Sequence, residues 1–267
     1  MDLLERSMTD KPLILLGKGG GGTRLLSLMA QDCGVCIGNE VNTSGDCMDM
    51  EKAIKQTMTD KLQNPESFNR VRSIETLRLS AEKMLHEMRP DQRLSWGFKL
   101  PESLFILPEL ADAFPKARYG VIFKNPLHNS IRRTHLTSRL NTPEGKVTLP
   151  AAYEYAGIES SRIESDNFLL HNAYTTRHQL ELLIGFLSHQ ELPASRCFIC
   201  KYEDIIRSPH EQLKAFSAWL GRPETGSGLA DAVDVNRAKQ VTEADDATRE
   251  KVRSIVKQIS EKLGYEI

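Results

Sequence analysis

The sequence predicts an α/β fold in which helices cover both faces of a mostly parallel sheet. Apolar, strand-like runs alternate with helix-like segments along the 267 residues, and the first run leads into a glycine-rich loop. Such alternation is typical of parallel sheets, whose strands are joined by helical crossovers. Hydrophobic residues make up 40% and charged residues 27%, which are values of a globular chain. The net charge of −1 gives no general affinity for nucleic acid, so any basic site must be local.

The glycine-rich loop spans residues 17–24 and reads Gly-Lys-Gly-Gly-Gly-Gly-Thr-Arg. Backbone amides in such a loop, together with the N-terminus of the following helix, bind phosphate. Lys18 and Arg24 add full positive charges. A nucleotide hydrolase of the Walker A type needs a lysine and a hydroxyl residue where Thr23 and Arg24 stand. The loop therefore predicts phosphate binding and disfavours a magnesium-dependent hydrolase, while a flexible loop without a ligand is the simpler alternative.

The remaining elements follow from periodicity and from helix-start and helix-stop residues. Strands are expected at 12–16, 34–38, 96–101, 118–123 and 196–202, and helices at 23–31, within 49–88, and at 102–114, 167–189, 209–220 and 245–263. Pro65 divides the segment 49–88 into at least two helices. Residues 141–161, with two prolines and two glycines, are expected to form a substrate loop or lid. We expect one domain, 1–267, with a helical insertion at about 49–90 and a helical tail at about 222–267.

Charged residues follow several of the expected strands at their carboxyl ends, where open α/β sheets bind ligands. Glu40 follows the second strand and has a plausible catalytic position, although it also fits an exposed loop glutamate. Lys99 closes the third strand, and Lys124 follows the fourth. Arg132 and Arg139 continue this basic stretch without an intervening acid and are expected to share one helix face. The stretch is either an anion site or a solvated charged face.

Two Cys-x-x-Cys pairs occur, Cys33 with Cys36 and Cys197 with Cys200. Four thiolates suit zinc or redox chemistry, but both pairs lie in strand-like runs, where the two side chains face opposite sides. Buried free thiols are therefore favoured. The N-terminus lacks the pattern of a signal peptide and no apolar run has the length of a membrane helix, so a soluble cytoplasmic protein is expected.

Three stretches in this order resemble the superfamily of sulfotransferases that use 3′-phosphoadenosine 5′-phosphosulfate (PAPS). Residues 19–26 are similar to the 5′-phosphosulfate loop, especially that of heparan sulfate 3-O-sulfotransferases. Residues 124–126 and the segment after them resemble the part of the family that binds the 3′-phosphate. Residues 201–204, followed by 208–209 and 219–221, resemble the family's late Tyr-Glu-Asp strand and the end of the next helix.

The resemblance implies a P-loop-like fold and transfer of a sulfuryl group from PAPS to an acceptor hydroxyl, with PAP as product and without a metal. Glu40, in Asn-Glu-Val, matches the catalytic base of the heparan enzymes, while Lys99 and Lys18 would stabilise the leaving phosphate as catalytic groups. The implied cofactor contacts are Lys18, Gly19, Gly20, Gly21, Gly22, Thr23, Arg24, Lys124, Arg132, Tyr202 and Arg237. The implied acceptor is a carbohydrate or a small molecule, with neither nucleic acid nor membrane as partner.

The chain departs from the family pattern at several of these positions. Gly20 stands where the family's loop carries a basic residue, Lys124 replaces the 3′-phosphate arginine and Arg132 replaces a serine. No histidine follows Lys99, although cytosolic small-molecule sulfotransferases use one as base. Two alternatives stay open: a P-loop kinase or nucleotide hydrolase, and a non-catalytic nucleotide-binding module of the same fold. The sequence indicates neither the acceptor nor the oligomeric state.

Overall fold

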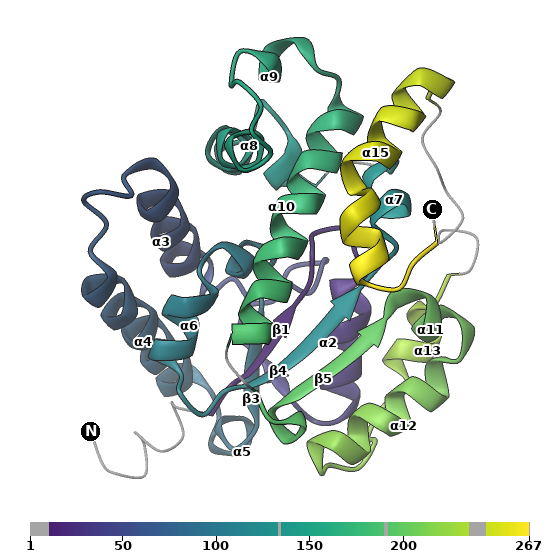
Figure 1. The fold of residues 1–267 in the computed structure, drawn as a ribbon. Coiled ribbons are helices and arrows are strands. Elements are labelled where there is room, and N and C mark those ends of the chain that lie inside the picture. The colour runs from purple at the N-terminus through teal and green to yellow at the C-terminus, as the bar shows by residue number, and fades with distance from the viewer. Residues whose placement is uncertain (1–10, 133–134, 190–191, 235–243, 267) are drawn as a thin grey trace.

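A parallel sheet of five strands forms the centre of the computed structural model, which describes residues 11–132, 135–189, 192–234 and 244–266. The strand order is β2-β3-β1-β4-β5, and every neighbouring pair is parallel. The strands are β1 (Leu13–Leu16), β2 (Cys36–Ile37), β3 (Trp96–Lys99), β4 (Arg118–Phe123) and β5 (Cys197–Lys201). The predicted parallel α/β sheet is thereby confirmed, with each strand close to its expected place (Figure 1).

The helices that join the strands also lie mostly where the sequence predicts them. The α-helices are α2 (Thr23–Asp32), α3 (Glu51–Gln63), α4 (Arg70–Glu87), α5 (Pro90–Arg93), α6 (Leu107–Ala113), α7 (Pro126–Ser130), α8 (Pro143–Tyr155), α9 (Arg162–Ser165), α10 (Phe168–His189), α11 (Tyr202–Arg207), α12 (Pro209–Leu220), α13 (Gly228–Ala232) and α15 (Asp246–Lys262). Short 3-10 helices are η1 (Pro101–Phe105), η2 (Leu136–Ser138) and η3 (Ala194–Arg196). As expected, Pro65 lies between α3 and α4, and Gly221 ends α12 in a left-handed conformation.

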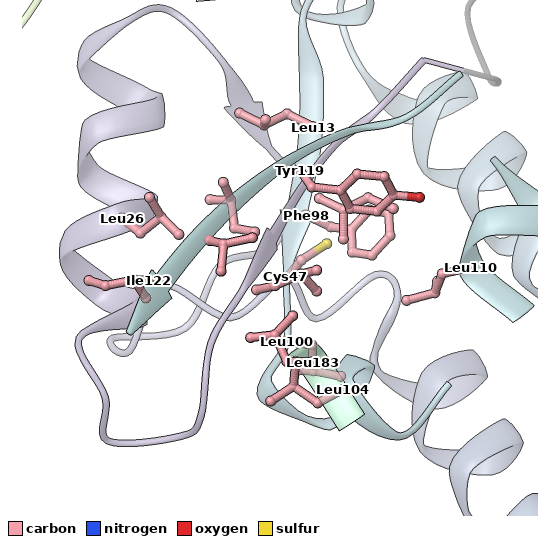
Figure 2. Packing of buried hydrophobic residues seen from close by; sticks show 14 of the residues in the cluster. Leu13, Leu26, Cys47, Phe98, Leu100, Leu104, Leu110, Tyr119, Ile122 and Leu183 are labelled. Carbon is pink, nitrogen blue, oxygen red and sulfur yellow. The ribbon is translucent and has the colours of Figure 1, made fainter. Parts of the chain in front are cut away.

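Both faces of the sheet are covered, and β4 shows how its side chains divide between them. Tyr119 packs edge-on against Phe186 of α10, with ring centroids 5.3 Å apart. The next residue, Gly120, faces the other side, where a side chain would meet Phe216 of α12 and Leu26 of α2. Figure 1 shows α10 in front of the sheet and α2 behind it, and Figure 2 shows Tyr119 and Leu26 on opposite sides of the strand. The carboxyl ends of the strands remain accessible to the loops that carry the site.

The prediction of a loop or lid at 141–161 is wrong, because residues 143–155 form the helix α8. Its proline and glycine have helical roles here: Pro143 occupies the first turn, where its missing N–H costs nothing, and Thr142 caps the helix by accepting a hydrogen bond from the amide of Gly145. Gly145 passes so close to the carbonyl of Arg139 that a side chain would not fit. Pro143 and Gly145, which suggest a loop when the sequence is considered alone, are therefore compatible with a helix once the chain is packed.

Three smaller expectations also differ from the structure. Arg132 and Arg139 do not share a helix face, because α7 ends at Ser130 and Arg139 lies just beyond η2. Cys33 is not in a strand, because it caps the C-terminus of α2. The expected helix at 102–114 divides into η1 and α6, because the backbone turns at Ile106.

Candidate functional site

The glycine loop joins β1 to α2 and is shaped by contacts that only glycine permits. Gly20 and Gly22 adopt φ values of 79° and 100°, a region that side chains rarely enter. A Cβ atom on Gly22 would lie 2.4 Å from the Tyr202 ring, and one on Gly19 would lie 2.3 Å from the His135 ring. No side chain of the described residues caps α2. The amide of Leu25 donates to the carbonyl oxygen of Gly22 at 2.9 Å, which leaves the amides of Thr23 and Arg24 available to an anion.

Lys18 belongs to this loop, but its side chain is buried and only 2% of its surface is exposed. Its ammonium donates to the side-chain oxygen of Asn172 at 3.2 Å and to the hydroxyl of Ser138 at 3.4 Å. It also lies 3.4 Å from the carbonyl oxygen of Gly19. Burial lowers the pKa of Lys18 to about 7, although the nearby Glu102 carboxylate opposes the shift. The positive charge that Lys18 adds to the loop is thus held by α10 through Asn172.

Asn172 connects Lys18 to a second element. Its amide nitrogen donates to the carbonyl oxygens of Asn129 and Ser130 in α7, both at 2.8 Å. Asn172 belongs to a stripe of buried polar residues on α10, spaced three and four apart: His171, Asn172, Thr175, Thr176 and Gln179. The sequence interpretation missed these residues, although a polar stripe on the buried face of a long helix is a signal that sequence carries.

The second cationic group follows β4, next to β1. The ammonium of Lys124 lies 4.3 Å above the centre of the Tyr202 ring, and both residues are buried. The same ring fills the space beside Gly22, so it connects Lys124 to the glycine loop. The structure therefore brings together three of the residues predicted from separate stretches of sequence. Thr23 is buried at the start of α2, and Arg132 is half-buried beyond α7.

The backbone after Lys124 is held from two other elements. Glu203 of α11 accepts a hydrogen bond from the amide of Asn125 at 3.0 Å. The hydroxyl of Tyr265, which follows α15, donates to the other oxygen of Glu203 at 2.9 Å. Tyr265 was not predicted, because nothing in the sequence places the chain end near β4. Arg237, the C-terminal candidate for the 3′-phosphate, lies outside the described residues.

Lys99 is the last residue of β3 and is 1% exposed. Its ammonium forms an ion pair with Asp46 and donates to the carbonyl oxygen of Ser44 at 2.8 Å. Burial lowers the pKa of Lys99, as does the nearby Arg24, while Asp46 opposes the shift. Arg24 is exposed on the first turn of α2. Lys99 and Arg24 are thus close enough for the charge of Arg24 to affect Lys99.

The carboxylate that contacts Lys99 comes from Asp46 and not from Glu40. Asn42 folds the intervening turn, because its side-chain oxygen accepts hydrogen bonds from the amides of Ser44 at 2.9 Å and Asp46 at 3.0 Å. Glu40 itself is exposed, and its backbone amide donates to Asp49 at 3.1 Å. The structure therefore places Glu40 on the outer side of the loop after β2 and points Asp46 inward.

A second acid, Glu102, lies three residues after Lys99 and was missed in the sequence. Glu102 is 2% exposed, and burial raises its pKa to about 7. His135, which packs on Gly19, belongs to the same group of charges: burial and then Lys18 lower the pKa of its imidazole to about 3. A glutamate shortly after a strand end is visible in the sequence, but its burial depends on packing of η1 against α3 and α10.

Within the described residues, no group of three or more His, Cys, Asp or Glu side chains is arranged to hold a metal ion. The five cysteines are free thiols, and burial raises the pKa of Cys33 to about 11 and that of Cys200 to about 12. No helix among the described residues has the length and apolar character to cross a membrane.

A family model of the sulfotransferase family matches residues 12–226, which covers the sheet, the glycine loop and both cationic groups. This chain belongs to the sulfotransferase family. It is a sulfotransferase enzyme of α/β fold. No curated protein sequence matches it significantly.

Solved sulfotransferase structures share the fold at low identity. Sulfotransferase STF9 from Mycobacterium avium has a TM-score of 0.59 at 13% identity, covering 97% of this chain and 78% of its own. The sulfotransferase domain of the Synechococcus PCC 7002 olefin synthase has a TM-score of 0.52 at 18% identity, with coverages of 96% and 95%. A sulfotransferase from Alicyclobacillus acidocaldarius has a TM-score of 0.51 at 11% identity, with coverages of 96% and 97%.

Sulfotransferases generally take the sulfuryl group from a PAPS-type donor, and the residues of this sulfotransferase fit such a donor. The glycine loop packs so tightly against the Tyr202 ring that a Cβ atom at Gly22 would not fit, and no side chain of the described residues caps the N-terminus of α2 beside it. Lys124 follows β4 and Tyr202 follows β5, and together they offer a cation and an aromatic ring.

Proposed function

We propose that this sulfotransferase moves the sulfuryl group of PAPS to a hydroxyl of a carbohydrate or small-molecule acceptor, without a metal and with a glutamate as base. The observation that carries the proposal is the Tyr202 ring, which contacts Gly22 on one side and Lys124 on the other. It joins a glycine loop and a separate cation into one site for a nucleotide with two phosphate positions.

In this proposal the loop amides of residues 19–24 and Arg24 bind the 5′-phosphosulfate, and Lys18 adds charge from below. Lys124 and Arg132 bind the 3′-phosphate together with Arg237. Lys99 donates to an oxygen of the reacting group and stabilises charge that develops on the leaving phosphate. PAPS supplies the activated sulfuryl group when bound. The resemblance to heparan enzymes assigns the base to Glu40.

Ligand binding tests the proposal independently of the unidentified acceptor. PAP should raise the Tm of the full chain, and Lys124→Ala should reduce that rise to near zero, because Lys124 is the buried cation of the 3′ position. Lys146→Ala, at an exposed lysine on α8, is the matched control and should respond to PAP as the wild type does.

The outcome that would overturn the proposal is equally direct. A Tm unaffected by millimolar PAP in the wild type, or a full PAP response in Lys124→Ala, would contradict the two-phosphate site. A Tm rise with ATP and magnesium but not with PAP would instead favour a kinase or nucleotide hydrolase.

A further inference from the structure

Glu102 occupies an unusual position for an acid. It lies on the first turn of η1, directly after the β3 end that carries Lys99, and it is 2% exposed. Among the described residues, no other side chain forms a hydrogen bond or an ion pair with its carboxylate. The carboxylate has a hydrogen bond from its own backbone amide. Buried carboxylates are normally paired with a cation, so one without an ion pair, three residues after Lys99, calls for a chemical role.

The charged side chains around Glu102 come from five elements, and most of them form ion pairs with other residues. Those facing it are Lys18 in the glycine loop, Asp46 in the loop after β2, Lys55 on α3, Lys99 on β3 and Glu144 on α8. On the remaining side, α10 packs against η1 through the neutral ring of His178 on Phe105.

Two of the three lysines are neutralised by other acids. Lys55 forms ion pairs with Glu51 at 2.6 Å and with Glu144 at 2.7 Å, and Lys99 is paired with Asp46. Burial therefore dominates at Glu102, which explains why its pKa is raised to about 7. A carboxyl group with that pKa is both a competent proton acceptor and a ready proton donor near neutral pH.

We propose that Glu102, rather than the exposed Glu40, accepts the proton of the acceptor hydroxyl in this enzyme; the assignment rests on the proposed sulfuryl transfer from PAPS. The carboxylate takes the hydroxyl proton as the acceptor oxygen bonds to sulfur. The bond between sulfur and the 5′-phosphate oxygen breaks, and its electron pair leaves on that oxygen. Glu102 ends the step as a neutral acid and returns its proton to water after product release.

The other acids and the histidine of the cluster are less suited to this role. Asp46 forms an ion pair with Lys99, and breaking this pair would leave the buried Lys99 ammonium without its counter-charge. His135 has its pKa lowered to about 3, so its imidazole is a weak base near neutral pH. Glu40 is exposed to solvent on the outer side of its loop, where water competes for the proton.

The experiment compares Glu102→Gln with Glu40→Gln and with Glu109→Gln in the full chain. Glu109 is the matched control, a buried glutamate of α6 that is ion-paired with Lys61 at 2.8 Å and lies outside the cluster. Release of PAP from PAPS is followed from pH 5 to 9, with 1-butanol and N-acetylglucosamine as probe hydroxyls.

Wild-type kcat/KM should rise with a midpoint near pH 7, because the ionised Glu102 is the active form. Glu102→Gln should lower kcat/KM by about 10²–10⁴-fold and remove that midpoint, while its PAP-induced rise in Tm is kept. Glu109→Gln should lose Tm through its broken ion pair and keep the midpoint. A midpoint that survives in Glu102→Gln, or that disappears only in Glu40→Gln, overturns the assignment.

A second readout does not depend on turnover. Glu102 holds its proton more tightly in the folded state, so the folded state loses stability as pH rises from about 4.5 to about 7. The Tm of Glu102→Gln relative to wild type should therefore increase between pH 5 and pH 8, and a constant difference would contradict the buried carboxyl. A wild type without PAP binding overturns the sulfotransfer proposal, whereas PAP binding with a pH-independent difference overturns only the role of Glu102.

Discussion

Replacing Lys18 by Met should stabilise the ligand-free protein, because Lys18 is a buried cation without a carboxylate partner among the described residues. Burial moves its pKa from 10.5 to about 7. That difference corresponds to a penalty of about 4 kcal/mol on the folded state at pH 7. Methionine has a similar length and leaves Asn172 without its donor, at a cost of about 2 kcal/mol. The net gain of about 2 kcal/mol corresponds to a Tm increase of about 5 °C for a chain of this size.

The effect has a defined dependence on pH. The unfolded chain keeps the Lys18 proton up to about pH 10.5, while the folded chain releases it near pH 7. Wild-type stability therefore rises with pH across this window, because the unfolded state binds more protons there. The advantage of Lys18→Met should be full near pH 7 and should shrink toward pH 10.

Thermal unfolding of the full chain at pH 7 and pH 9.5, with and without PAP, measures both effects. Lys83→Met, at an exposed lysine of α4, is the control and should change Tm by less than about 1 °C. The PAP-induced rise should be smaller in Lys18→Met, because a cation beneath the 5′-phosphate is lost. A lower Tm at pH 7, or a gain that is the same at both pH values, would refute the reasoning.

Two further predictions concern the contacts around Tyr202 and Glu203. Gly22→Ala should cost about 2–4 kcal/mol, measured by urea unfolding, and should weaken PAP binding, because a Cβ atom at φ 100° would lie 2.4 Å from the Tyr202 ring. An unchanged stability would show that the loop tolerates a side chain. Tyr265→Phe should weaken PAP binding about fivefold by calorimetry, because it removes the 2.9 Å hydrogen bond to Glu203, which holds the backbone of Asn125 after Lys124. Equal PAP affinity would mean that Tyr265 only anchors the chain end.

The parts of this fold that sequence predicted correctly are those specified by neighbouring residues. The five strands are short apolar runs, and the glycine loop needs its φ angles locally, so both were identified from the chain alone. The helix α8 was missed because Pro143 and Gly145 resemble loop residues until Arg139 and η2 are packed against them. The local residue preferences at 143–155 favour a loop and the tertiary packing favours a helix, and the packing determines the structure.

The candidate site shows the same division. Lys99 and Lys124 were predicted because each ends or follows a strand, and parallel strands bring such residues to one edge. Asp46 was not predicted, because its approach to Lys99 depends on the Asn42 side chain, which folds the turn between Glu40 and Asp46. Glu40 and Asp46 are six residues apart in the same loop after β2. Their positions in the sequence therefore do not show which of the two carboxylates approaches Lys99.

The ion pair of Lys99 constrains how the proposed reaction is arranged. A lysine ammonium has three donors, and in the described part of the chain two of them are used by Ser44 and Asp46. The third N–H of Lys99 can bind a sulfuryl oxygen while the ion pair with Asp46 is kept. Separating the pair would leave a buried charge uncompensated, which costs more than adding one acceptor. Asp46 is thus retained as the partner of Lys99. In the proposed reaction the proton of the acceptor hydroxyl is therefore transferred to Glu102, the buried carboxyl group of the cluster whose pKa lies near neutrality.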